Sequence, residues 1–474
     1  MRLSGTAFLV LVFAAACGRK EVPDPSRTSV AAPSRAAEQP PALVVAAETA
    51  PAALVAAAPG RPLSADMDKA RSALAETTAG KSASAPARAP EGSRPSAVTG
   101  PFQGGFVKAG ECDDNANYRE FQRWLATEGG LPFHRVSLEH RRFIVVRDER
   151  GLPVPGCHVT IADGRGGTAQ LVSTSSGRAL LFPRAEGLHG DEVTAIAKCE
   201  EGTSRTLFSL ESDDGIVDLK LVAPRQLPST RSIDIAFILD TTGSMREEIA
   251  ALSGTIQKVA DSLRGGNVEV TVGMVEYKDR GDEYVTRVHP MTRDVRGFSA
   301  QIAAVRAEGG GDMPESVNAA VHAAVTQLDW RSAAVARLAF LIGDAPPHLD
   351  YEDDFDYVDD MRTAAHRGIQ IFTIAASGMN DLGQAVFRQI AQYTGGTNMF
   401  VLRGGAGPQS LGAGDPKSSC GGTQTAYKSG NLDALVLAKV HQAIAALDAD
   451  PLRIAGVRQD ENAKPCAERL VIAQ

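Results

Sequence analysis

The stretch from 231 to 447 alternates short apolar runs with segments whose apolar residues recur three or four positions apart. The runs at 235–239 and 338–342 are rich in large apolar residues and bounded by polar ones, which is typical of strands buried within a parallel sheet. Helical spacing follows the first run, at Ile249, Leu252, Ile256, Val259 and Leu263. The alternation predicts an α/β fold with a Rossmann-like, doubly wound and mostly parallel sheet.

Residues 134–224 follow a different pattern, in which short β-prone runs are separated by turn signals such as those at 163–164 and 176–177. About six or seven strands over this stretch predict a small all-β sandwich ahead of the α/β domain. Residues 148–182, with the Gly-Leu-Pro-Val-Pro-Gly segment at 151–156, resemble a carboxypeptidase-regulatory-like, transthyretin-type module. Such modules usually serve as spacers or adhesive units, so no chemistry is expected here.

Residues 1–17 have the pattern of an export signal, with Arg2 ahead of an apolar core at 7–16 that is too short to span a bilayer. The small residues directly before Cys17 resemble a bacterial lipobox, which implies that Cys17 is lipidated and becomes the mature N-terminus. Gly18, where sorting to the inner membrane uses Asp, favours the outer membrane. The alternative is an ordinary secretory signal that happens to contain a Cys.

Three further segments complete the chain. Residues 18–100 are dominated by Ala, Pro, Ser, Arg and Glu with almost no aromatics, which predicts a disordered linker. Residues 101–133 include Tyr118, Phe121 and Leu125 at helical spacing and predict a short helical segment that packs on the next domain. Residues 448–474 are expected to form a C-terminal tail.

The charge and the cysteines restrict the function further. A net charge of −8 without a basic run argues against a nucleic-acid partner. Five cysteines follow Cys17, and none lies in a Cys-x-x-Cys pattern, so disulfides are expected in an exported protein. We predict the pairs Cys157–Cys199 and Cys420–Cys466, because each falls within one presumed folding unit, and we expect Cys112 to stay free.

Three segments carry candidate chemistry. Asp240, Thr242 and Ser244 follow the first apolar run, and their alternate spacing at a strand end directs one carboxylate and two hydroxyls into one crevice. A Gly-Gly-Gly-Asp loop ending in Asp312 opens a later helix, and Asp344 follows the second apolar run. All of these side chains offer oxygen, which suits a hard divalent cation. Taken alone, the first segment could equally be a turn with Ser244 as a helix N-cap.

Together, these three segments resemble the von Willebrand factor A domain with its metal-ion-dependent adhesion site. The resemblance covers residues 231–447 and implies that Asp240, Thr242, Ser244 and Asp312 hold the cation, with Asp344 acting on it directly or through water. Asp312 stands where many members have Thr, which makes the site more anionic. In the family, an acidic residue of a partner protein often fills the open coordination position.

Two features that follow Asp344 in the sequence allow more than one interpretation. Acidic residues gather just after His348, and they could form a second cation site or a partner-facing patch, although a solvated helix N-terminus is the simpler interpretation: Glu352, Asp353, Asp354, Asp356, Asp359 and Asp360. His348 is near enough in sequence to Asp344 to face the crevice, but a single loop histidine is more often exposed.

The preferred interpretation is a non-enzymatic, lipid-anchored protein of the bacterial envelope that binds a protein partner through a divalent cation, which could be Mg, Mn or Ca. A metal-dependent hydrolase is the first alternative, but no general base is spaced to serve Ser244. An envelope scaffold with a structural metal is the second.

Overall fold

The computed structural model describes residues 108–127, 130–246, 249, 258–259, 261–262, 267–311, 313–376, 378–401, 430–455, 457 and 471–472. The predictions for the export signal, Cys17, the linker at 18–100, Asp312, Cys420 and Cys466 lie outside these residues. Among the described helices, none combines the length and the apolar character needed to cross a membrane.

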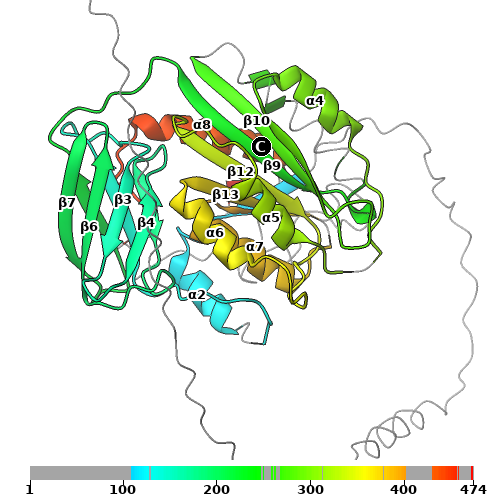
Figure 1. Ribbon diagram of the computed structural model, residues 1–474, viewed down its shortest axis with the longest axis horizontal. Coiled ribbons are helices and arrows are strands. Elements are labelled where there is room, and N and C mark those ends of the chain that lie inside the picture. The colour runs from blue at the N-terminus through cyan, green and yellow to red at the C-terminus, as the bar shows by residue number, and fades with distance from the viewer. Residues whose placement is uncertain are drawn as a thin grey trace, which may run out of the picture. The chain divides into compact units, whose positions relative to one another are not determined.

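A nine-stranded, mostly parallel sheet is the centre of the described chain, so the predicted α/β architecture is confirmed (Figure 1). Its order along the main path is β11 (Thr286–Thr292), β10 (Val268–Tyr277), β9 (Arg231–Asp240), β12 (Ala336–Gly343), β13 (Ile369–Ala375), β14 (Asn398–Val401), β1 (Lys108–Cys112) and β15 (Gly430–Asn431). The strands from β10 to β14 along this path run parallel, whereas β11 and β1 pair antiparallel with their neighbours. The central strands β9 and β12 are buried almost throughout, which explains their continuous apolar sequence.

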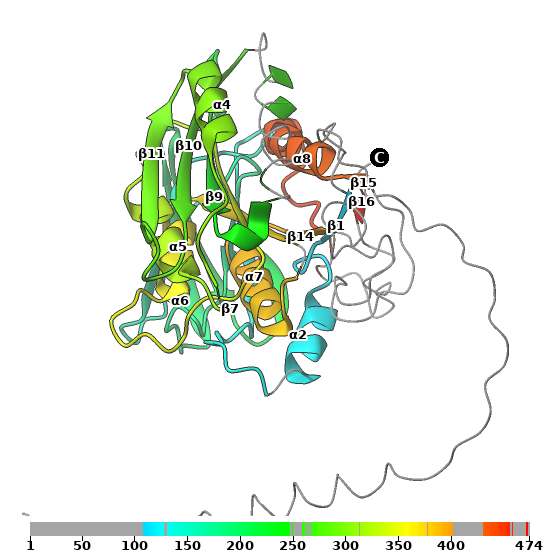
Figure 2. The ribbon, with the colours of Figure 1, turned by 90° about the vertical axis from the view of Figure 1, so that its right-hand side faces the viewer.

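Helices cover both faces of this sheet (Figure 2). Alternate side chains of β9 point to opposite faces. Phe237 packs on the side of α4 (Val295–Ala304) and α8 (Leu432–Ala445). Ile238 packs on the opposite side, where four helices lie: α2 (Tyr118–Thr127), α5 (Val317–Thr326), α6 (Tyr357–His366) and α7 (Asp381–Tyr393). The sheet is therefore buried between two helical layers, as in doubly wound folds.

The region between α2 and β9 contains two smaller antiparallel or mixed sheets. One has the order β5 (Arg178–Leu181), β2 (Arg141–Arg147), β8 (Asp214–Lys220), and the other has the order β4 (Thr168–Val172), β3 (His158–Ala162), β6 (Glu192–Cys199), β7 (Gly202–Ser209). One apolar cluster draws side chains from both sheets, including Ile144 of β2 and Val159 of β3.

The segment before this region is more than the short helix that the sequence predicts. β1 joins the edge of the central sheet, pairing with β14 on one side and with β15 and β16 (Val471–Ile472) on the other. Asp114, just after β1, forms a buried bidentate ion pair with Arg388 of α7, at 2.8 and 2.6 Å. The central sheet thus recruits residues from outside 231–447.

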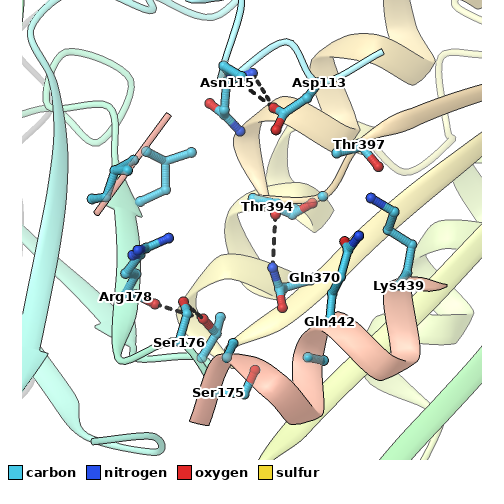
Figure 3. A pocket seen from close by; sticks show the side chains of 18 of the residues that line it. Asp113, Asn115, Ser175, Ser176, Arg178, Gln370, Thr394, Thr397, Lys439 and Gln442 are labelled. Atoms are coloured by element: carbon cyan, nitrogen blue, oxygen red, sulfur yellow. Dashed lines mark hydrogen bonds between the residues drawn. The ribbon is translucent and has the colours of Figure 1, made fainter. Parts of the chain in front are cut away.

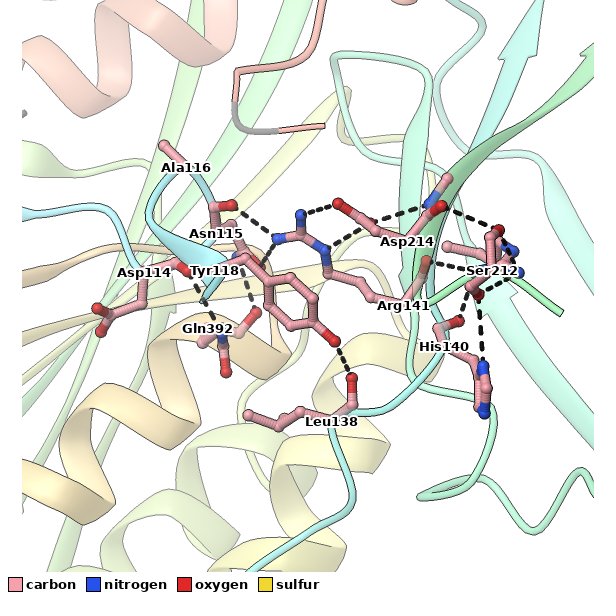
Figure 4. A network of polar contacts seen from close by, with 12 residues as sticks. Asp114, Asn115, Ala116, Tyr118, Leu138, His140, Arg141, Ser212, Asp214 and Gln392 are labelled. Atoms are coloured by element: carbon pink, nitrogen blue, oxygen red, sulfur yellow. Dashed lines mark hydrogen bonds and ion pairs between the residues drawn. The ribbon is translucent and has the colours of Figure 1, made fainter. Parts of the chain in front are cut away.

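A polar network ties this first segment to the two-sheet region (Figure 4). The fully buried guanidinium of Arg141 on β2 donates to the carbonyl of Asn115 at 2.7 Å and pairs with Asp214 of β8 at 2.6 Å. The central carbon of this guanidinium, Cζ, lies 3.8 Å from the centre of the Tyr118 ring. One cation therefore contacts the first segment and two strands of the smaller sheet.

The disulfides agree with the prediction in one case and differ in another. Cys157 and Cys199 form the predicted bond, with their Cα atoms 4.5 Å apart. Cys112 is also disulfide-bonded, with a partner outside the described residues, so the expectation that it stays free is wrong. The expectation treated Cys112 as lying before both folding units, but β1 carries it into the central sheet opposite Asn398.

Candidate functional site

The end of β9 places the first group of predicted site residues together. Asp240 is fully buried, and its Oδ1 accepts hydrogen bonds from the backbone nitrogen of Thr242 at 2.9 Å and from its Oγ1 at 2.7 Å. The Thr242 hydroxyl lies 3.1 Å from Oγ of Ser244, in the 3-10 turn η1 (Gly243–Met245). The alternate spacing of these residues therefore gathers three oxygen-bearing side chains at the strand end.

Asp344 reaches the same place from the neighbouring strand. It follows β12, which pairs in parallel with β9, and its Oδ1 accepts a hydrogen bond from Ser244 Oγ at 3.2 Å. The close approach requires the glycine before it. A Cβ on Gly343 would lie 2.3 Å from the Tyr277 hydroxyl and 3.3 Å from Oδ2 of Asp240. Asp240, Thr242, Ser244 and Asp344 thus form one linked group of oxygens.

The glycine loop packs directly against this group. The backbone nitrogen of Gly243 donates to the carbonyl of Gly309 at 2.9 Å, and Gly309 and Gly310 adopt positive φ angles of 82° and 70°. A Cβ on Gly310 would lie 3.1 Å from Cβ of Thr242, so the loop approaches more closely than a side chain allows. Asp312, the predicted cation ligand in this loop, lies outside the described residues. Gly311 and Met313, on either side of it, are described.

Glu315 belongs to the site and was not predicted. Only 3% of it is exposed, its Oε2 has no hydrogen-bond partner, and Oε1 lies 3.2 Å from the position of a Cβ on Gly310. Burial, followed by the charges of Asp240 and other acids nearby, raises the pKa of Glu315 to about 9. The sequence feature that could have identified Glu315 is its position three residues after Asp312, in the same Gly-Gly-Gly-Asp-Met-Pro-Glu segment.

Among the described residues, no basic side chain forms an ion pair with Asp240, Glu315 or Asp344. Oδ2 of Asp240 is buried without a hydrogen-bond partner. Burial and the nearby Asp344 raise the pKa of Asp240 to about 7, and burial also raises the pKa of Asp344. Burying carboxylates close together is unfavourable unless a cation joins them. Two orphaned carboxylate oxygens among hydroxyls fit a hard divalent cation.

Carboxylates alone do not complete such a site in the part of the chain that the structure describes. Within it, no group of three or more His, Cys, Asp or Glu side chains is placed to hold a metal ion. The predicted set relies on two hydroxyl ligands, Thr242 and Ser244, and on Asp312, which lies outside that part. The oxygens of Asp240, Thr242, Ser244 and Asp344 are the described portion of the candidate site.

A hydrogen-bonded cluster supports the rim of the site. Asp279 accepts hydrogen bonds from Ser316 Oγ at 2.9 Å and from the Tyr351 hydroxyl at 3.1 Å, and it lies 3.3 Å from Nε2 of His348. The other ring nitrogen of His348 lies 2.7 Å from Asp350. His348 is 6% exposed, so the expectation of a solvent-exposed histidine is wrong; stacking on the Tyr351 ring and two carboxylate contacts hold it inside.

The acidic residues that follow serve several structural purposes. Asp356 caps α6 by accepting a hydrogen bond from the backbone nitrogen of Val358 at 2.9 Å, in keeping with the helix N-terminus interpretation. Asp354 accepts a hydrogen bond from Asn318 at 3.1 Å, and Asp353 pairs with Arg280 at 2.6 Å. These contacts tie the loop before α6 to α5 and to the loop after β10.

A separate cavity of about 380 Å³ lies away from these residues (Figure 3). Its walls include Arg178, Gln370, Thr394, Lys439 and Gln442, and they contain none of the predicted metal-site residues. Three backbone carbonyls, those of residues 450, 451 and 453, accept hydrogen bonds from Arg178. The cavity marks where the smaller sheet and the C-terminal segment meet, rather than the candidate cation site.

Comparison with known proteins agrees with this geometry. Residues 234–402 match the model of the von Willebrand factor A domain. The chain contains a von Willebrand factor A domain. This A domain includes β9, the glycine loop and β12, and so all the described oxygens of the candidate site.

The curated relatives match this chain over only a small part of their own length. Over 102 residues it is 33% identical to rat and 35% identical to human von Willebrand factor A domain-containing protein 7. The match covers 21% of this chain and 11% of each relative. Among solved structures, BatB from Bacteroides thetaiotaomicron is similar over 46% of this chain and 98% of its own, at 15% identity and a TM-score of 0.30.

Proposed function

We propose that this protein binds another protein through a divalent cation held at the carboxyl ends of β9 and β12. The A domain supports an interaction or adhesion type of function. The observation that carries the metal dependence is the pair of buried, unpartnered carboxylate oxygens on Asp240 and Glu315. Asp240 contacts the Thr242 hydroxyl, which lies 3.1 Å from that of Ser244, and Thr242 and Glu315 both lie against Gly310.

Asp240, Thr242, Ser244 and Asp312 would hold the cation, with Asp344 contacting it directly or through water. The cation supplies an electrophilic centre to which a partner's oxygen can bind. The chain's own contribution is to hold the hydroxyls in place: Thr242 is fixed by Asp240, and Ser244 by Asp344. We expect binding without turnover, with the Asp344 carboxylate, which accepts the Ser244 hydrogen bond, serving to hold that hydroxyl in place.

The charge of the site restricts the partner's ligand. Asp312 would add a fourth carboxyl group to those of Asp240, Asp344 and Glu315 in the neighbourhood of one divalent cation. An acidic residue of the partner, as used elsewhere in the family, therefore meets a more anionic centre than in a site with Thr at position 312. A partner whose coordinating residue lies among basic residues would fit this face best.

We also propose that the protein is anchored to the bacterial envelope through lipidated Cys17, with the outer membrane as the favoured location. The linker at 18–100 would then separate the folded part from the bilayer. If this segment is a flexible coil, as its composition predicts, about 80 residues give it a root-mean-square span of roughly 50 Å. Such a reach suits a protein that captures a partner at a distance from its membrane.

Capture from envelope extract tests the proposal. Full-length protein, its Asp240→Ala variant and its Asp329→Asn variant would be immobilised and exposed to extract with Mg²⁺, Mn²⁺ or Ca²⁺, or with chelator. Asp329 is the control because it is exposed and precedes β12, at the end of that strand away from Asp344. The proposal expects a partner retained by wild type and Asp329→Asn with a cation, and lost with chelator or Asp240→Ala. Retention in chelator would favour a scaffold with a structural metal, and turnover of a substrate would favour an enzyme.

A further inference from the structure

A second cavity lies on the other side of the metal-site loops. It has a volume of about 350 Å³ and is enclosed by the end of β10, the start of β11 and the segment after α4. This volume is within the range of pockets that bind small molecules. None of the predicted cation ligands lines it. We name it the Lys278 cavity, after the buried lysine in its wall.

Lys278 is a buried cation that forms no ion pair with any of the described residues. It is 3% exposed, and its Nζ donates to the carbonyl of Thr241 at 2.7 Å and to the carbonyl of Glu308. Among the described residues, no carboxylate oxygen lies within 4.0 Å of this nitrogen. An ammonium group has three donors, so one remains for a ligand.

Two other basic side chains in the wall have carboxylate partners. Arg287 lies 3.1 Å from Glu283 and 3.9 Å from Glu276, and His289 lies 2.6 Å from Glu276. The remaining cation, Arg306, and the third carboxylate of the wall, Glu308, are exposed to solvent. A buried charge is stable only when it is paired or well hydrogen-bonded. Lys278 is therefore the position in this wall where an incoming anion gains most.

The rest of the wall indicates the shape of the ligand. The Tyr284 ring lies 5.4 Å from the Lys278 ammonium, and its hydroxyl is held by Glu276 at 2.8 Å and Thr241 at 2.9 Å. Ala304 and Val305 contribute small apolar side chains to the same cavity. The wall thus combines a fixed aromatic ring, two aliphatic side chains and an ammonium group with one remaining donor. This combination suits a carboxylate on a short apolar stem.

We propose that the Lys278 cavity is an anion site that takes such a carboxylate through the Lys278 ammonium. The ligand is either a free small carboxylic acid or the side chain of a partner's glutamate, which present the same chemistry. The anion site does not need the cation in order to bind its ligand. It nevertheless lies next to the candidate cation site, because Lys278 holds the carbonyls of Thr241 and Glu308, in the two loops that carry the predicted cation ligands.

Titration of the full-length protein with propionate in the presence of chelator tests the site separately from the proposed function. Isothermal titration should show saturable binding with a dissociation constant on the order of millimolar, as so small a ligand allows. Lys278→Met should weaken it about tenfold or more, while Lys220→Met, a change of an exposed lysine on β8, should leave it unchanged. Absence of saturable binding to wild type would overturn the proposal.

A second pair of variants keeps Lys278 in place. Ala304→Phe fills the cavity and should abolish binding, whereas Ala303→Phe, the adjacent exposed position outside the cavity wall, should not. Equal binding by wild type, Lys278→Met and Ala304→Phe would also overturn the site. A parallel titration with N-acetyl-glutamate amide separates the sources. Binding of both probes supports a partner's side chain, and binding of propionate alone supports a free small acid.

Discussion

Ser244 Oγ donates a hydrogen bond to Oδ1 of Asp344 at 3.2 Å, although the two residues are 100 positions apart in the chain. The contact forms because β9 and β12 are parallel neighbours, so their carboxyl ends meet at one edge of the sheet. It joins the first and last segments of the candidate cation site. The predictions that follow depend on the charges and contacts around this edge.

In the absence of a cation, the protein should lose stability as the pH rises from about 5 to about 8. The pKa of Asp240 is raised to about 7 and that of Glu315 to about 9, chiefly by burial. In the unfolded chain both groups titrate near about 4, so the folded state binds more protons across this window. The free energy of unfolding should then fall by up to about 1.4 kcal/mol per pH unit for each group.

Denaturant unfolding in chelator at several pH values measures this dependence. Asp240→Asn should reduce the slope, because an amide does not titrate. A stability that rises steadily from pH 5 to pH 8 in wild type would contradict the assigned burial of these carboxyls.

The Asp114–Arg388 pair should matter strongly for stability. The side chains of Asp114 and Arg388 are 2% and 3% exposed, and Asp114→Asn would leave the Arg388 guanidinium buried without its counter-ion. A loss of about 3 kcal/mol in the free energy of unfolding is expected. The double variant Asp114→Asn, Arg388→Met should lose less than the sum of the two single changes, and strict additivity would show that the pair does not act as a unit.

The disulfides can be tested by peptide mapping under non-reducing conditions. Cys157–Cys199 should be found, and its 42-residue separation predicts a stabilisation of about 4 kcal/mol in the chain-entropy account. Cys112 should be found joined to a second cysteine. Recovery of a free Cys112 thiol would contradict its assignment to a disulfide in β1.

Lipidation of Cys17 is predicted from the small residues before it at the end of a short apolar core. Mass spectrometry of the mature protein should find a diacylated or triacylated N-terminal cysteine. A Cys17→Ser variant should lose membrane association while it keeps the folded part intact. A free amino group at any other residue would contradict the anchor.

The central sheet could be predicted because its strands are buried on both faces and therefore read as continuous apolar runs, as 235–239 does in β9. The gathering of Asp240, Thr242, Ser244 and Asp344 at one edge of the sheet could be predicted because they come within a few residues of such runs, whereas their binding of a cation stays a prediction. β1 could not, because Lys-Ala-Gly-Glu-Cys carries no strand pattern and is a strand only through its pairing with β14.

Glu315 and Lys278 show where local sequence gives too little information. Glu315 enters the site because the glycine loop folds back on Thr242, a contact that depends on the positive φ angles of Gly309 and Gly310. Lys278 is buried because two backbone carbonyls from separate loops converge on its ammonium. Both placements result from tertiary contacts that the spacing of residue types does not encode. The burial of His348 likewise results from tertiary contacts, with Tyr351 and Asp279.

The most direct test of the cation site compares melting curves of wild type and Asp240→Ala in chelator and then with Mg²⁺, Mn²⁺ or Ca²⁺. Wild type should gain about 2.7 kcal/mol at a hundredfold excess over the dissociation constant, because the cation binds only the folded state. Asp240→Ala should show no gain, and its apo form should be as stable as wild type or slightly more so, since one repelling charge is gone. A wild type without a cation-dependent shift, or a variant with the same shift, would contradict the account.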